Sequence, residues 1–178
     1  MAVLIEGNSV VIRADAINTK FKGGWNAFKD LVPNQTMCAD NELVRVGFMS
    51  PSDVEAFIKK LERNGLDFLR GSDAVDIAVA DQLRGLSSPA SWLEFGHISL
   101  GGDPSRTIAA CRFTNGAVTK VVMPPDWSFE GSLSQTYGFV PSEHTDKSLR
   151  YLRHENGLDV YLNLVTKKEV YIGRTDKS

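Results

Sequence analysis

The sequence predicts an α+β protein with antiparallel-rich sheets and two or three short helices. Short runs rich in branched residues alternate with polar turns, which is typical of strands. One segment, 51–63, has the apolar spacing of an amphipathic helix, and Asn-Gly pairs mark several turns. The composition, 42% hydrophobic and 24% charged over 178 residues, is that of one folded domain able to bury about 70% of its unfolded surface.

In the first half of the chain, helix 51–63 is the best-defined element. Ser50 is placed to cap it, Pro51 suits its first position and Gly65 is placed to end it. Its apolar residues share one face: Val54, Phe57, Ile58 and Leu61. The other elements expected here are strand 10–14, helix 24–31, strand 43–48 and strand 75–80. Segment 82–91 is the most plausible linker.

The second half predicts an antiparallel meander over 92–123. Strands 92–100 and 106–114 flank a Gly-rich loop, and Asn115-Gly116 suggests a tight hairpin into 117–123. We prefer the register that places Glu94 opposite Arg112, because it also puts apolar residues together on the other face: Leu93, Phe95, Cys111 and Phe113. A second hairpin is expected from 159–165 and 169–173.

The two halves of the chain share a short pattern. Gly47-Phe48-Met49-Ser50-Pro51 resembles Gly138-Phe139-Val140-Pro141-Ser142, and each precedes a stretch that ends in Asn-Gly-Leu-Asp. This predicts either one compact domain, 1–178, or two pseudo-repeats, 1–89 and 90–178. The alternative is that both copies are independent helix punctuation. In the repeat interpretation, a second helix covers about 142–154.

Charge and cysteine content indicate the compartment of the protein and the classes of partner that it binds. Twenty Lys and Arg oppose 22 Asp and Glu, for a net charge of −2, whereas nucleic-acid-binding domains are usually basic. The longest apolar stretch, 74–80, is too short to span a membrane, and the first residues lack the pattern of a signal peptide. Two cysteines favour a reducing compartment. We therefore expect a cytoplasmic protein that binds neither nucleic acid nor membrane.

Motifs for cofactors, metals and nucleophiles are sparse. The histidines His97, His144 and His154 lack zinc-ligand spacing, and no phosphate-binding or serine-elbow motif is present. We expect no cofactor and no metal. Cys111 is interpreted as a small buried hydrophobe and Cys38 as a more exposed loop residue. His97, which follows Phe95 on the same strand face, is interpreted as a core histidine bonded to a backbone group.

One surface has the composition of a partner-binding patch. Arg150, Arg153 and His154 share one face of the expected helix, with Tyr151 beside them. The loop residues Trp127 and Phe129 either close the edge of the core or present an exposed aromatic platform. Arg and aromatic side chains are enriched in interface hot spots. We expect these residues to bind an acidic partner protein.

Three functions follow from these features. The first is a small non-catalytic interaction protein, such as a toxin-neutralising or regulatory partner. The second is a small-molecule hydrolase or transferase that uses His97 with Glu94, or His154 with Glu155, in a cleft between the halves. The third is a small-ligand sensor. A deep pocket lined by His97 together with a carboxylate favours the enzyme. A flat or convex surface that bears Arg150, Tyr151 and Arg153 favours the interaction protein.

Overall fold

The computed structural model describes residues 1–116, 120–137, 149–155, 158–163 and 169–173. It confirms an α+β fold with antiparallel sheets. The chain forms two compact units. The first unit comprises Met1–Ile98 and Ala109–Trp127, and the second comprises Ser99–Ile108 and Ser128–Ser178.

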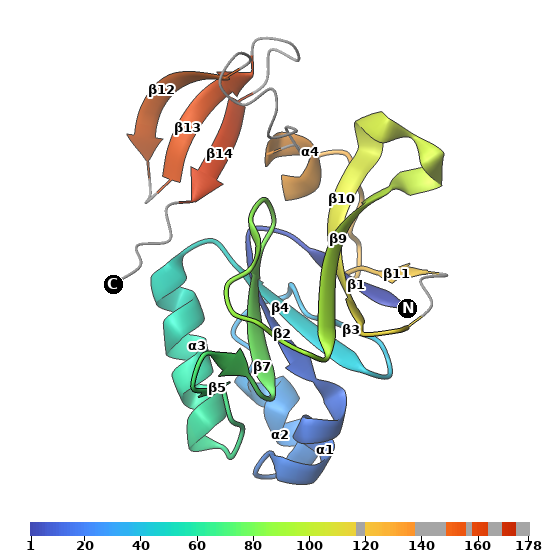
Figure 1. Cartoon of the computed structure of the whole chain (residues 1–178), viewed down its shortest axis with the longest axis vertical. Coiled ribbons are helices and arrows are strands. Elements are labelled where there is room, and N and C mark those ends of the chain that lie inside the picture. Colours follow the sequence, from blue (N-terminus) through green and yellow to red (C-terminus); the bar gives the residue numbers. More distant parts are fainter. Residues whose placement is uncertain (117–119, 138–148, 156–157, 164–168, 174–178) are drawn as a thin grey trace. The chain divides into compact units, whose positions relative to one another are not determined.

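A five-stranded antiparallel sheet is the centre of the first unit. Its order is β3 (Cys38–Ala39), β4 (Leu43–Phe48), β2 (Asn8–Arg13), β7 (Ile77–Asp81) and β8 (Gly85–Leu86). The helices α1 (Ala14–Lys20), α2 (Gly24–Leu31) and α3 (Pro51–Arg63) cover one face of this sheet (Figure 1). Apolar residues of β2, β4 and β7 pack there against the three helices, and this is the first core.

The prediction for helix 51–63 is confirmed as α3. The Ser50 side chain accepts a hydrogen bond from the Asp53 backbone N–H, and Gly65 adopts the left-handed conformation with φ of +106°. The backbone N–H of Leu66 then donates to the carbonyl of Leu61, which closes the helix end. The four expected stripe residues are all buried. Helix 24–31 and strand 43–48 also have the expected bounds.

A four-stranded sheet packs on the other face. Its order is β11 (Val121–Val122), β1 (Ala2–Ile5), β10 (Thr107–Phe113) and β9 (Leu93–Ser99). Alternate residues of β1, β9 and β10 meet alternate residues of β2, β4 and β7 in the second core. Alternation along each strand explains this arrangement, since β2 has Val10 and Ile12 in the first core and Val11 in the second.

The expected register of the 92–114 hairpin is confirmed where it can be read. The Arg112 Nε lies 2.7 Å from the Glu94 Oε2, and the backbone N–H of Thr114 donates to the carbonyl of Trp92. The expected meander is wrong in its last step. Val121–Val122 pairs in parallel with β1 instead of returning beside β10. β1, too short to stand out in the sequence, occupies the place beside β10.

Smaller elements complete the described chain. In the first unit, β5 (Leu69–Arg70) pairs with β6 (Asp73–Ala74). In the second unit, two short 3-10 turns occupy Leu100–Gly102 and Pro104–Arg106, and α4 covers Leu133–Tyr137. A three-stranded antiparallel sheet follows, built from β12 (Leu149–Glu155), β13 (Leu158–Asn163) and β14 (Glu169–Gly173). Its β13–β14 pairing confirms the expected terminal hairpin, whose turn 164–168 lies outside the described residues.

Several expectations from the sequence are wrong. The helix over 142–154 is replaced at Leu149–Glu155 by strand β12, and 142–148 lies outside the described residues, so the pseudo-duplication is not confirmed. Segment 82–91 is no linker, because Gln82 is buried and exchanges hydrogen bonds with Gly7. Helix α1 was not expected, and strand 10–14 instead ends at Arg13.

Candidate binding site

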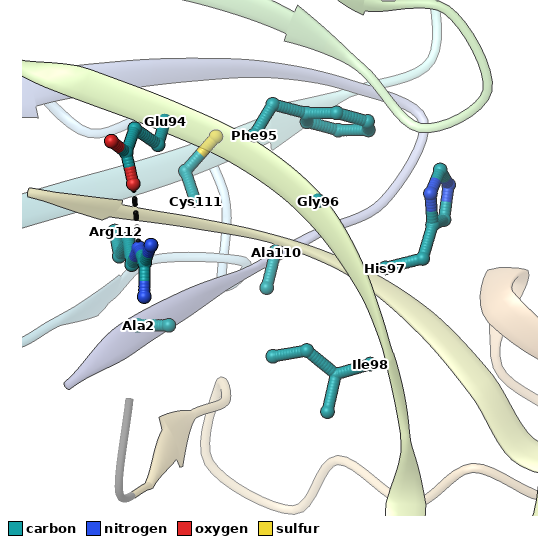
Figure 2. A pocket seen from close by; sticks show the side chains of 9 residues that line it. All are labelled: Ala2, Glu94, Phe95, Gly96, His97, Ile98, Ala110, Cys111 and Arg112. Atoms are coloured by element: carbon teal, nitrogen blue, oxygen red, sulfur yellow. Dashed lines mark hydrogen bonds and ion pairs between the residues drawn. The ribbon is translucent and has the colours of Figure 1, made fainter. Parts of the chain in front are cut away.

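An open hollow of about 270 Å³ lies along β9 and its neighbour β10, and Figure 2 shows the side chains that line it. Its lining comes from β9, β10 and β1, and every lining residue belongs to the first unit. The residues that line it are Ala2, Glu94, Phe95, Gly96, His97, Ile98, Ala110, Cys111 and Arg112.

Strand alternation explains how these residues are arranged. Glu94, Gly96 and Ile98 occupy every second position of β9, so they share one face of the sheet. Ala110 and Arg112 do the same on β10, and Ala2 pairs with Arg112. Of the intervening residues, Phe95 and Cys111 pack in the second core, whereas His97 does not. The face that carries Gly96 is therefore the one turned away from the five-stranded sheet.

Gly96 creates the opening in this face. It is exposed, and a Cβ placed on it would have no heavy atom within 4 Å. Its φ lies outside the left-handed region, so the backbone does not require glycine. A glycine inside a strand weakens the strand and often marks a close approach by a ligand or another backbone. The backbone at position 96 would thus accept a larger residue, and the glycine leaves a space on this face of the strand.

An ion pair borders the hollow at one end. The Arg112 Nε donates to the Glu94 Oε2 at 2.7 Å, and each side chain is 42% exposed. Figure 2 shows this pair at the opposite end of the lining from His97. A half-exposed pair of this kind stabilises a fold by about 0–1 kcal/mol. Its groups can therefore exchange with a ligand's charges at little cost to the fold.

His97 does not occupy the core, so that part of its interpretation is wrong, whereas the expected bond to a backbone group is present, at Gln82. The residue is exposed, and its ring meets Phe95 edge to face with the centroids 5.2 Å apart. Partial desolvation lowers the pKa of His97, while a hydrogen bond with the backbone of Gln82 acts in the opposite direction. The lowered pKa favours a neutral imidazole at neutral pH.

Both thiols are buried. Burial raises the pKa of Cys111 to about 12, which agrees with its interpretation as a small hydrophobe. Cys38 was expected to be more exposed, but it is 4% exposed, and burial raises its pKa to about 11 against the opposing charge of Arg45. A protonated thiol is a poor nucleophile. Cys111 therefore offers no nucleophile to the hollow.

The two aromatic residues of the expected partner-binding patch are covered. The Trp127 side chain is half-buried and its Nε1–H donates to the Glu6 Oε1 at 2.8 Å. Phe129 is buried, and the Arg106 guanidinium lies 5.1 Å from its ring centroid. The bond of Trp127 to Glu6 and the burial of Phe129 argue against an exposed platform, although neither residue belongs to the two cores described above.

The remaining patch residues lie on a strand. Arg150, Tyr151, Arg153 and His154 belong to β12, where the register shifts between Tyr151 and Arg153. The prediction that these residues share one face of a helix is therefore wrong. On β13, His154 pairs with Asp159, and Glu155 pairs with Leu158. The side chains of these residues, and His144, lie outside the described part of the structure, so their role in partner binding stays a prediction.

Comparison with known proteins assigns neither a family nor a function to this chain. No protein-family model, no curated protein and no solved structure matches this chain. Within the described ranges, no group of three or more His, Cys, Asp or Glu side chains is placed to hold a metal ion. No helix in that same part of the chain is both long and apolar enough to cross a membrane.

Sequence reasoning named Glu94, His97 and Arg112 but missed the hollow between them. The available signal was Gly96 itself, a glycine in the middle of an otherwise strand-like run. Its significance depends on which side chains surround it on the neighbouring strands, and that requires the position of β1 beside β10.

Proposed function

We propose that this chain is a binding protein that receives part of a ligand or partner in the hollow beside β9. The observation that carries this proposal is the open space over Gly96, in an exposed stretch of β9. Apolar groups of Ile98 and Ala110 surround it, with a charged pair at one end. Binding sites typically combine apolar walls with a few placed polar groups.

The size of the hollow limits what it accepts. Pockets for drug-sized ligands and cofactors span about 300–1,000 Å³ and enclose most of the ligand. This hollow, at about 270 Å³, lies below that range. It suits a small fragment or a single side chain better than a nucleotide.

Titration with small probes tests this function. N-acetyl-leucine amide, indole and isopentanol are added to isotopically labelled protein, and the backbone amide signals are followed by NMR. We expect saturable shifts centred on Gly96, Ile98 and Ala110, and their loss in Gly96→Val, which fills the space. Ser99→Val places the same valine side chain on β9, at an exposed position of the opposite strand face, and serves as the control. Shifts that persist in Gly96→Val would refute the site.

A hydrolase or transferase is the second candidate, because His97 and Glu94 both line the hollow. A general base and its orienting carboxylate need hydrogen-bond contact, about 2.6–3.2 Å. Figure 2 shows the two side chains at opposite ends, and the Glu94 carboxylate is held by Arg112. This geometry favours binding over acid–base catalysis. Turnover of p-nitrophenyl esters or phosphates that disappears in His97→Gln, with the fold intact, would reverse that preference.

A further inference from the structure

The strand that carries the hollow is also a sheet edge. In the described part of the chain, β9 is the last strand of the order β11-β1-β10-β9. An edge strand presents backbone N–H and C=O groups that can pair with another chain. Lysines and prolines commonly prevent such pairing, and Leu93–Ser99 contains neither.

We propose that the natural occupant of the hollow is an extended segment of a partner protein that adds a strand to β9. This inference rests on the proposed function and names the class of ligand. The added backbone pairs with β9 beyond Leu93, whose N–H already donates to the carbonyl of Ala90, and one of its side chains enters the space over Gly96. In this mode the backbone bonds supply affinity, and pockets for alternate side chains supply specificity.

The chemistry of the neighbouring positions defines the partner's sequence pattern. Side chains directly opposite one another on paired strands lie about 4.5–5.5 Å apart, and opposite charges or apolar pairs are favourable there. Glu94 lies on β9 itself, one strand nearer to the added segment than Arg112. The partner residue beside Glu94 is therefore basic. The residues beside Gly96 and Ile98 are apolar, so the pattern is basic-x-apolar-x-apolar, read in either chain direction.

A second copy of this chain fits the same edge less well. The residues of β9 are Leu-Glu-Phe-Gly-His-Ile-Ser, which supply no lysine or arginine to oppose Glu94. The charge of Glu94 thus favours a different chain, and self-association becomes an outcome of the test.

The experiment uses the full chain and blocked synthetic peptides. Thr-Lys-Thr-Leu-Thr-Ile-Thr and its reversed sequence represent the two strand directions. Each is compared with a version in which Lys is replaced by Glu, and with a version N-methylated at alternate residues, which lacks the donors for pairing. Affinities come from NMR titration, with sedimentation to follow self-association.

We expect one direction of the Lys peptide to bind with shifts along β9, and the N-methylated version not to bind. The Glu peptide should bind about three- to tenfold more weakly, because it places like charges opposite each other. Glu94→Lys should reverse that preference, Gly96→Val should abolish binding and Ser99→Val should leave it unchanged. Urea midpoints close to that of the unmodified protein verify that each variant is folded. If Gly96→Val unfolds, Gly96→Ala replaces it, with a smaller expected loss of peptide binding.

Several results would overturn strand addition. One is equal binding of the N-methylated and plain peptides. Another is binding of small probes in the hollow with no binding of any peptide, which would leave the proposed function standing. A dimer that is lost in Gly96→Val would identify a second copy as the occupant. Failure of the small probes and the peptides together would instead refute the proposed function itself.

Discussion

Arg45 is a buried cation in the centre of the first unit, and its neighbour Gly47 makes room for it. Arg45 is 2% exposed, and burial lowers the pKa of its guanidinium. The Nε donates to the Ser9 Oγ at 2.9 Å, the Nη1 to the carbonyl of Thr36 at 3.0 Å and the Nη2 to the carbonyl of Glu6 at 2.8 Å. These bonds tie β4 to β2 and to the chain on either side.

Replacing Gly47 by alanine should disturb this arrangement. The added Cβ would lie 2.8 Å from the Arg45 Cζ and closer still to its Nη2, so the guanidinium must move. Overpacking of this kind costs about 1–3 kcal/mol. A shift that breaks the bonds of a buried charge costs more, about 3–5 kcal/mol. We therefore expect Gly47→Ala to lower the free energy of unfolding by at least about 1 kcal/mol.

Gly96→Ala is the matched control, because it makes the same change in a strand glycine that has open space around it. Where the conformation is compatible, Gly→Ala is neutral or stabilises by about 0.4–1 kcal/mol. Urea unfolding of both variants measures the difference. In Arg45→Met the steric cost of Gly47→Ala should largely vanish, since the branched guanidinium is gone. Equal midpoints for the two alanine variants, or the same cost with and without Arg45, would refute the reasoning.

Three further predictions concern the rest of the first unit. Asp67 pairs with Lys20 at 2.6 Å, which lowers the pKa of the Asp67 carboxyl. The stability that this group contributes is present above its usual pKa and is lost as the pH falls through the lowered pKa. Asp67→Asn should therefore flatten the acid branch of a plot of urea midpoint against pH. Leu93→Ala, at a 3% exposed core position, should lower the free energy of unfolding by about 2–5 kcal/mol in urea. Glu94→Ala should lower it by about 0–1 kcal/mol. Comparable losses of stability in the two variants would contradict the assigned faces of β9. Cys38 and Cys111 should resist iodoacetamide at pH 8 and react after unfolding, because burial raises both pKa values; rapid alkylation of the native chain would show that they are accessible.

Local signals predicted much of the first unit. The cap at Ser50, the apolar stripe and Gly65 define α3 within the sequence itself, and the pairing of Glu94 with Arg112 followed from matching faces of adjacent strands. These features depend on residues close in the chain, or on one hairpin. Periodicity and turn chemistry therefore suffice to predict them.

One error is local: Leu149–Glu155 has helix-compatible spacing, but it forms a hairpin with β13, the next strand in the chain. The other errors arose where distant segments decide the structure. Val121–Val122 joins β1, from the start of the chain, in place of its sequence neighbour β10. The hollow at Gly96 also depends on Ala110 of β10 and Ala2 of β1, which line it with Gly96. No local pattern records such contacts.

Direct observation of an occupant in the hollow tests the central claim most simply. Crystals of the full chain, soaked with N-acetyl-leucine amide, would be compared with crystals of Gly96→Val treated in the same way. The account predicts the leucine side chain over Gly96, against Ile98 and Ala110, and no bound molecule there in the variant. A hollow that stays empty while the probe occupies another surface, or an identical complex in Gly96→Val, would contradict it.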